Sequence, residues 1–306
     1  MTAYLLGRVA QSVLAVVCVL ALVFFMVRLT GDPSVVMLPQ DASPEDVARF
    51  RAAMGFDRPL TVQFVDFVRR AVVADFGKSL QYRTSAWSLI MERLPATLEL
   101  AIVSITFAVL VAVPLGILGA TRRGSVWDAL AQGVALLGQA LPAYWVGLIL
   151  ILVLSVQLHL LPVAGRSDWR SLVMPMITLG MGTLGRLTQL TRSVMLDALA
   201  QDYVRTAWAK GLAPSAVRFR HALKNAAIPL ITLIGVNFGY MLGGAVLIES
   251  VFSYPGIGRL AAQAIFQRDF PLVQAVAFFA SVVVIAVNLA TDLVYGLVNP
   301  QVRLRS

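Results

Sequence analysis

The sequence predicts an all-α membrane protein with six transmembrane helices, a small extracytoplasmic helical segment after helix 1, and a cytoplasmic loop between helices 4 and 5. Of its 306 residues, 58% are apolar and only 13% are charged, whereas soluble chains carry about 25% charged residues. The mean hydropathy is +0.80, and long charge-free runs alternate with basic segments. Lipid is therefore the expected solvent for much of the chain.

The first span is expected within residues 1–29, where positions 9–27 hold no charge between Arg8 and Arg28. A helix that crosses about 30 Å of hydrocarbon needs roughly 20 mainly apolar residues. This run is longer than the apolar part of a signal peptide, and no A-x-A-like cleavage site follows it, so we expect it to remain as an anchor. The other spans are expected at residues 100–121, 129–160, 171–191, 225–248 and 270–292.

The third span is the ambiguous one, because residues 129–165 are an uncharged run of 37 residues. That is too long for one straight span and barely enough for two. A single span, bent near Pro142, places both chain ends, Arg122-Arg123 and the later basic loop on one side, as the positive-inside rule favours. The fourth span contains Arg186, which must snorkel, face a cavity or pair inside the bundle.

Residues 30–96 form the expected extracytoplasmic segment. Ser43 is a good N-cap, with Pro44 and Asp46 after it, for a helix that should end near Gly55. A second amphipathic helix is predicted over 61–73, with Val65, Val68 and Val72 on one face. The domain with the remaining spans is expected to cover 97–298, with a cytoplasmic tail at 299–306.

Composition and motifs argue against several other functions. The net charge of +9 fits basic cytoplasmic loops better than nucleic-acid binding. One cysteine, Cys18, and two distant histidines, His159 and His221, supply no metal-ligand set. Gly77-Lys78-Ser79 resembles the end of a phosphate-binding loop, but Val72 stands where that loop needs its first glycine. We therefore expect no catalytic residue, no metal and no cofactor on this chain.

Intramembrane acids are scarce, which disfavours an ion-coupled transporter. Asp128, Glu249 and Asp292 all fall at predicted span ends, where we expect solvated structural roles. The fifth span repeats glycine at every fourth residue, a spacing that allows close helix approach. Ordinary packing explains this pattern as well as a pathway or subunit interface does. The candidate pathway or interface residues are Gly235, Asn237, Gly239, Tyr240 and Gly243.

Residues 197–224 form the most informative segment, a basic block between two apolar runs. It holds Arg205, Lys210, Arg218, Arg220 and Lys224 against two aspartates. A helix is predicted from 197 to a glycine stop at Gly211, and a second from Pro214 or Ser215 to Leu223. Together they would form a rigid cytosolic knob. The alternative is a linker helix that lies on anionic lipid.

Motifs along nearly the whole chain then carry a resemblance. They are Gly31-Asp32-Pro33, Asp57-Arg58-Pro59-Leu60, Asp75-Phe76-Gly77-Lys78-Ser79-Leu80, Arg93-Leu94-Pro95-Ala96-Thr97-Leu98-Glu99-Leu100, Asp202-Tyr203-Val204-Arg205-Thr206-Ala207, Lys210-Gly211-Leu212, His221-Ala222-Leu223-Lys224-Asn225-Ala226, Phe252-Ser253-Tyr254-Pro255-Gly256-Ile257-Gly258-Arg259-Leu260 and Arg268-Asp269-Phe270-Pro271. In this order they resemble the type I permeases of ABC importers, specifically the B-type subunit of the dipeptide, oligopeptide and nickel group.

The basic block resembles the "EAA" loop of that family, on which the ATPase subunit docks. The Glu and first Ala of the general signature fall on Arg205 and Thr206, and its Ile and Pro on His221 and Lys224. Ala207, Gly211 and Leu223 fit strictly, so a Glu-specific contact with the ATPase is not implied here. The ATPase-coupling residues implied by the resemblance are Asp202, Tyr203, Arg205, Thr206, Ala207, Lys210, Gly211 and Leu223.

The resemblance implies a bacterial inner-membrane permease with both termini cytoplasmic, driven by alternating access. Its implied partners are a second homologous permease as a heterodimer, two cytosolic ABC ATPases that hold ATP and Mg, and an extracytoplasmic substrate-binding protein. Peptides are the implied substrate; nickel chelates, glutathione, opines and sugars use similar permeases. A secondary transporter, an intramembrane enzyme and a channel-like protein remain the alternatives from other classes.

Overall fold

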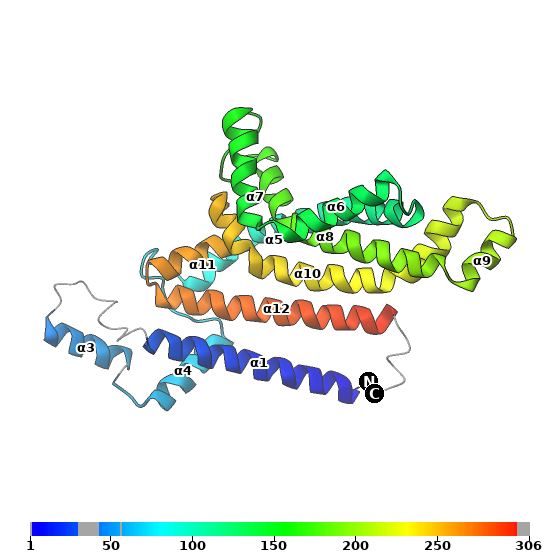
Figure 1. Ribbon diagram of the computed structural model, residues 1–306. Helices are drawn as coiled ribbons and strands as arrows, with labels where there is room; N and C mark the ends of the chain where they lie inside the picture. Colours follow the sequence, from blue (N-terminus) through cyan, green and yellow to red (C-terminus); the bar gives the residue numbers. More distant parts are fainter. Residues whose placement is uncertain (1, 30–42, 56, 299–306) are drawn as a thin grey trace. The chain divides into compact units, whose positions relative to one another are not determined.

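The computed structural model describes residues 2–29, 43–55 and 57–298, and within these the regular structure is helical. The chain forms two compact units, Met1–Ala96 with Pro255–Ile285 and Thr97–Tyr254 with Ala286–Ser306. Two long helices, α5 (Ala86–Thr121) and α12 (Phe270–Val298), contribute to both units (Figure 1). The Gly31-Asp32-Pro33 motif and the predicted tail at 299–306 lie outside the described residues.

The first unit contains α1 (Thr2–Leu29), α3 (Pro44–Met54), α4 (Leu60–Val72) and α11 (Ile257–Phe266). The predicted start and end of α3 are confirmed. Ser43 accepts from the Asp46 amide, the Asp46 side chain accepts from the Ser43 amide, and Gly55 ends the helix at φ 70°. Such hydrogen bonds depend only on a few adjacent residues, which is why the sequence predicts them well.

The buried face of α4 differs from the predicted one. Val65 and Val72 are 48% and 77% exposed, whereas Phe67 and Val68 pack against the core of the unit and Ala71 lies within it. Phe24 of α1 explains the choice, because its ring lies 5.3 Å from Phe64 and 5.7 Å from Phe67. Aromatic pairs bury more area than valines do, so the phenylalanines determine how α4 rotates.

The second unit is built around α8 (Arg170–Leu199), which packs against α6 (Val126–Ala140), α7 (Ala143–Leu150) and α10 (Leu223–Val251). Figure 1 shows α6, α8 and α10 running side by side, with the short α9 (Asp202–Ala209) at one end of the pair α8 and α10. A π-helical segment, Ile151–Gln157, continues α7, and another, Ala216–Ala222, leads directly into α10.

The predicted bend near Pro142 is present and sharp. The two helical stretches Val126–Ala140 and Ala143–Gln157 meet at 103°, and α7 turns away from α6 in Figure 1. Pro142 precedes the first residue of α7, and a proline there can neither donate a hydrogen bond nor continue the preceding helix. The bend is therefore confirmed, and the crossing of the membrane by this bent pair as one span stays a prediction.

Among the described residues, three helices are long and apolar enough to cross a membrane, Ala86–Thr121, Ala216–Gly243 and Phe270–Val287, and the bent pair makes up to four. The apolar part of α1 is shorter, Val13–Met26, and α8 does not meet the criterion. The count of six spans therefore stays a prediction. Helix α5 begins at Ala86, before the span predicted from 100, because the charged residues at 92, 93 and 99 do not interrupt its backbone.

Candidate functional site

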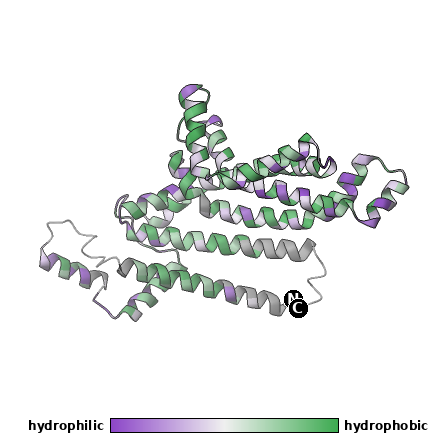
Figure 2. Cartoon of the chain, in the orientation of Figure 1, coloured by the Kyte–Doolittle hydropathy of each residue, from purple (hydrophilic) through white to green (hydrophobic). Residues whose placement is uncertain are grey.

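The predicted cytosolic knob is formed by α9 and the turn after it. Helix α8 runs through Leu199 and ends, Gln201 adopts an extended conformation (φ −75°, ψ 152°), and α9 begins at Asp202. The single helix expected over 197–211 is therefore two helices with a break at 200–201. Figure 2 shows that hydrophilic residues gather at α9, in contrast to the apolar helices.

A small core of its own holds α9 in place. Val204, Ala207 and Val217 are 1%, 4% and 0% exposed and pack together, with Leu199 against them. Two residues of α9, three positions apart, therefore face the π-helical segment before α10. Ala207, a position where the resemblance places a strict alanine, is buried in this core.

Gly211 ends the knob helix by its backbone conformation. Its φ is +72°, a region that glycine adopts readily and side chains with branched Cβ atoms do not. Its amide donates to the Trp208 carbonyl at 2.9 Å, and the Leu212 amide donates to the Ala207 carbonyl at 3.3 Å. The second predicted helix exists, beginning at Pro214, but it is continuous with α10 and not a separate element.

The outer surface of the knob is cationic and aromatic. Arg205 lies 3.3 Å from Asp202 in an exposed ion pair, and Thr206 and Lys210 are also exposed. Three aromatic rings accompany them, Tyr203, Trp208 and Phe219, at 38%, 46% and 57% exposure. Sequence reasoning missed Trp208 and Phe219. Of the eight predicted coupling residues, Ala207 lies in a core, Leu223 is half-buried against one, and the other six lie on the surface.

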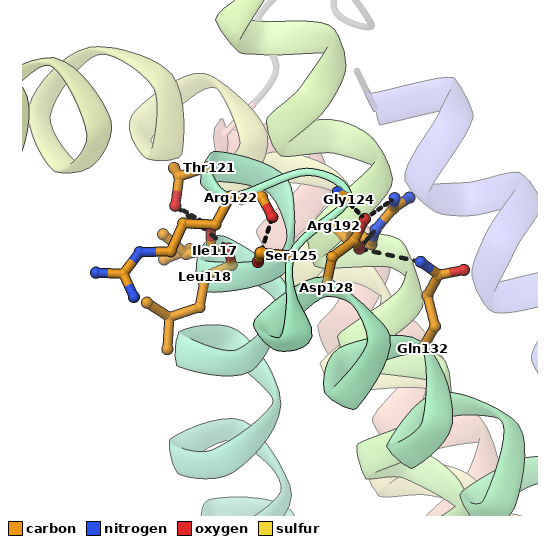
Figure 3. Close-up of polar contacts among 9 residues, drawn as sticks. All are labelled: Ile117, Leu118, Thr121, Arg122, Gly124, Ser125, Asp128, Gln132 and Arg192. Atoms are coloured by element: carbon orange, nitrogen blue, oxygen red, sulfur yellow. Dashed lines mark hydrogen bonds and ion pairs between the residues drawn. The ribbon is translucent and has the colours of Figure 1, made fainter.

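Near the end of α8 that leads to α9, a buried ion pair joins α8 to α6 (Figure 3). Asp128 is 4% exposed, so the expectation of a solvated acid at this position is wrong. Its Oδ1 accepts from Arg192 Nε at 2.6 Å and its Oδ2 from Arg192 Nη2 at 3.0 Å. The Gly124 amide and Gln132 Nε2 donate to the same carboxylate. A carboxylate with four donors can remain charged although it is buried.

The predicted pathway residues do not share one environment. Asn237 is 2% exposed while Tyr240 is 72% exposed. A Cβ on Gly239 would lie 3.2 Å from Val287, whereas one on Gly243 would have nothing within 4 Å. Gly235 is half-buried. Of Gly239 and Gly243, therefore, only Gly239 makes a close helix contact.

Asn237 connects α10 to the arginine that the sequence left unexplained. Arg186 Nη2 donates to Asn237 Oδ1 at 2.6 Å, and Thr183 Oγ1 donates to the same oxygen at 3.3 Å. The Asn237 Nδ2 donates to the Leu233 carbonyl at 2.7 Å. This last bond orients the amide, so that its oxygen points toward Arg186. The predicted pairing of Arg186 is therefore observed through Asn237, while the residue itself stays exposed.

A second polar cluster lies at the opposite end of α10 from the knob. Arg166 Nε donates to Glu99 Oε2 at 2.7 Å, and the Tyr254 hydroxyl donates to the same oxygen at 3.2 Å. The hydrogen bond to Glu99 raises the pKa of Arg166. Burial, followed by the charge of Glu99, raises the pKa of the Tyr254 phenol. Both groups therefore keep their protons and hold Glu99 as donors.

Glu249 is also buried, at 0% exposure, so its predicted solvation is wrong as well. Its Oε1 accepts from Thr97 Oγ1 at 2.7 Å. Asp292 belongs to the part of α12 whose side chains the structure does not describe. The partners of Glu249 and Asp128 lie 152 and 64 residues away, which is why no local pattern revealed them. Among the described residues, no three His, Cys, Asp or Glu side chains gather as a metal site would require.

Two families of known proteins match most of the chain. Residues 112–304 match the family described as "Binding-protein-dependent transport system inner membrane component". Residues 1–101 match the N-terminal family of the membrane component of the same transport systems.

Curated relatives are similar over their full length. The dipeptide transport system permease protein DppB of Escherichia coli (strain K12) is 36% identical over 336 residues, covering 99% of each chain. The di/tripeptide permease DppB of Pseudomonas aeruginosa is 39% identical, covering 92% of this chain and 93% of that protein. The glutathione permease GsiC of Salmonella typhimurium is 36% identical over 98% of each.

Solved structures show the same fold at lower identity. An inward-facing structure of the MetNI methionine ABC transporter superposes with a TM-score of 0.57 at 16% identity, covering 69% of this chain and 96% of that chain. An amino acid ABC transporter with histidines superposes with a TM-score of 0.55 at 16% identity, covering 68% and 93%.

Proposed function

The chain belongs to the family of binding-protein-dependent transport system inner membrane components, and we propose that it imports peptides as one permease subunit of an ATP-driven transporter. It is a multi-pass protein of the inner membrane. The full-length similarity to dipeptide and di/tripeptide permeases supports a peptide substrate. The glutathione permease at comparable identity is consistent with this, because glutathione is itself a small peptide with free carboxylates.

The observation that carries the mechanism is the construction of α9. It is a short helix on its own core, presenting cations and aromatic rings, and charged residues of this kind are costly to place in lipid. Aromatic rings and arginine are the side chains that dominate protein interfaces. We propose that a cytosolic ATPase subunit binds this surface, and that the ATP and Mg are held there and not on this chain.

A movement of α9 can be transmitted to the membrane helices through two connections. On one side α8 ends only two residues before α9, and on the other the π-helical segment leads into α10 without a break. Since α8 and α10 pack together, a displacement of the knob moves them as a pair. The Asp128–Arg192 ion pair extends that movement to α6. Closure of the ATPases on ATP would thus rock these helices between inward-open and outward-open states.

We propose two further partners for the transporter. A binding protein outside the membrane would deliver the peptide, and a second, homologous permease would form the other wall of the pathway as a heterodimer. Both termini and α9 would then face the cytosol, with residues 30–96 outside.

Reconstitution tests this proposal directly. The chain should be expressed with the permease, ATPase and binding-protein genes beside it, purified as a complex and placed in proteoliposomes. ATP-dependent uptake of a labelled dipeptide is the expected result. Absence of any co-purifying ATPase, or uptake that a proton gradient drives without ATP, would contradict it. Labelling of Lys210 from the outer face of intact cells would contradict the proposed orientation.

A further inference from the structure

The exposed residues of α8 form a polar stripe. Along this helix the exposed side chains are Arg170 at its start and then Arg186, Gln189, Ser193 and Asp197, spaced three or four residues apart. Residues at that spacing lie on one helix face. The other faces of α8 are covered by α6, α7 and α10.

Neighbouring helices of the same unit expose apolar residues instead. On α6, Leu130, Leu136 and Leu137 are 49%, 67% and 53% exposed, and on α10 Leu247 is 63% exposed. Those side chains suit contact with lipid. A face of arginine, glutamine, serine and aspartate does not, because polar groups in hydrocarbon are expensive unless they face protein or water. The polar residues of this stripe also explain why α8 is not apolar enough to be counted among the candidate membrane-spanning helices.

Arg186 is the one cation in the middle of this stripe, and its side chain is held in position by a neighbouring residue. Asn237 holds one of its terminal nitrogens at 2.6 Å, while Gln189, one turn further on, accepts from Gln139 of α6 at 3.0 Å. Among the described residues, no carboxylate lies within ion-pair distance of Arg186, whereas Arg192 on the same helix is paired with Asp128. An exposed, oriented guanidinium without a carboxylate partner suits a ligand that brings its own.

We propose that the stripe Arg186–Gln189–Ser193 lines the water-filled translocation pathway, and that Arg186, positioned by Asn237, binds the terminal carboxylate of the peptide in transit. This inference rests on the proposed function and adds to it a substrate contact. A guanidinium can donate two parallel hydrogen bonds to a carboxylate, a geometry that lysine or asparagine does not offer. Since α9 moves α8 and α10 together, the motion that the ATPases drive also carries this carboxylate site.

Accessibility labelling tests the lining of the pathway. Cys18→Ser removes the only cysteine, so single cysteines can then replace Gln189, Ser193 and, as a lipid-facing control, Leu136. A membrane-impermeant anionic methanethiosulfonate reacts with thiolates, which form in water and not in hydrocarbon. We expect Q189C and S193C to react at least about tenfold faster than L136C in the purified full complex. Equal, slow reaction at all three positions would show that lipid or the second permease covers the stripe, and would overturn the proposal.

Protection by peptide tests the carboxylate. In the same complex without binding protein, a dipeptide with a free C-terminus should slow labelling of Q189C, and the C-terminally amidated dipeptide should need about tenfold more for equal protection. R186Q should erase that difference, whereas R69Q, an exposed arginine on α4, should preserve it. Equal protection by both peptides, or none by either, would overturn the carboxylate contact. ATP-driven uptake by the unmodified complex, measured in parallel, decides the proposed function separately.

Discussion

The guanidinium of Arg192 spans both oxygens of Asp128, and so ties the last turns of α8 to the first turn of α6. The carboxylate side chain is 5% exposed and the guanidinium 23%. Removing one partner of a buried ion pair leaves the other charge without compensation, which is more costly than losing the pair altogether. Substitution of Asp128 or Arg192 alone should therefore destabilise the end of the second unit that carries α9.

Arg192→Gln should destabilise the complex by roughly 2–3 kcal/mol, a value reduced for the partial exposure of the arginine. The double variant Asp128→Asn/Arg192→Gln should be less destabilised than the sum of the two single variants. Thermal unfolding in detergent measures both. Arg49→Gln is the matched control, because the Arg49–Glu45 pair is 3.9 Å long and exposed, and it should leave stability unchanged. Additive single and double effects would contradict an energetic coupling.

Gly211 should tolerate asparagine and reject valine. Open space surrounds its position, with nothing within 4 Å of an added Cβ, so its φ of +72° alone decides the outcome. A β-branched residue there costs on the order of 1–3 kcal/mol, while asparagine adopts this conformation readily. Gly211→Val should reduce ATPase binding in pull-downs and peptide uptake, with membrane insertion intact. Gly211→Asn should retain both, and equal uptake by all three proteins would argue against the knob.

The parts of the molecule that the sequence predicted are those whose cause is local. The capping box of α3, the glycine stop at Gly211, the break at Pro142 and the long apolar helices each depend on a few adjacent residues or on composition. The basic block correctly marked α9, although its boundaries shifted, because the break at 200–201 follows from the packing of Val204 and Ala207 on Val217. Local hydrogen-bonding groups and hydropathy do not encode that contact.

The parts that the sequence did not predict depend on contacts between distant segments. Asp128, Glu249 and Arg186 each find partners on another helix, so their burial could not be read from their position at a span end or within one. Regular spacing drew attention to α10, whereas another close helix crossing uses glycines of α6 and α8 that no four-residue repeat marks.

Gly138 and Gly185 form that crossing, and alanine should not replace either. A Cβ on Gly138 would lie 2.7 Å from the Met181 carbonyl, and one on Gly185 would lie 2.8 Å from the Ala135 carbonyl. Both obstacles are backbone atoms that cannot rotate away, so Gly138→Ala should cost about 1–3 kcal/mol and lower uptake. Gly133→Ala on the same helix has nothing within 4 Å and should match the wild type in thermal unfolding. If Gly138→Ala and Gly133→Ala proved equally stable, α6 and α8 would be able to move apart at no cost in stability.

The Tyr254 hydroxyl should support Glu99 up to high pH. Tyr254→Phe removes a buried donor and should cost about 1 kcal/mol. Burial raises the pKa of Tyr254 above its ordinary value of 10.0. A group whose folded pKa lies above its unfolded pKa contributes stability that is complete below the unfolded value and is lost as pH rises through the folded one. The difference in melting temperature between wild type and Tyr254→Phe should therefore stay constant up to about pH 10 and shrink above it. Arg166→Gln, which changes Glu99's other donor, should lower the melting temperature without removing that high-pH decline. A gap that widens above pH 10 would mean that the phenol ionises more easily when folded, contrary to its burial beside Glu99.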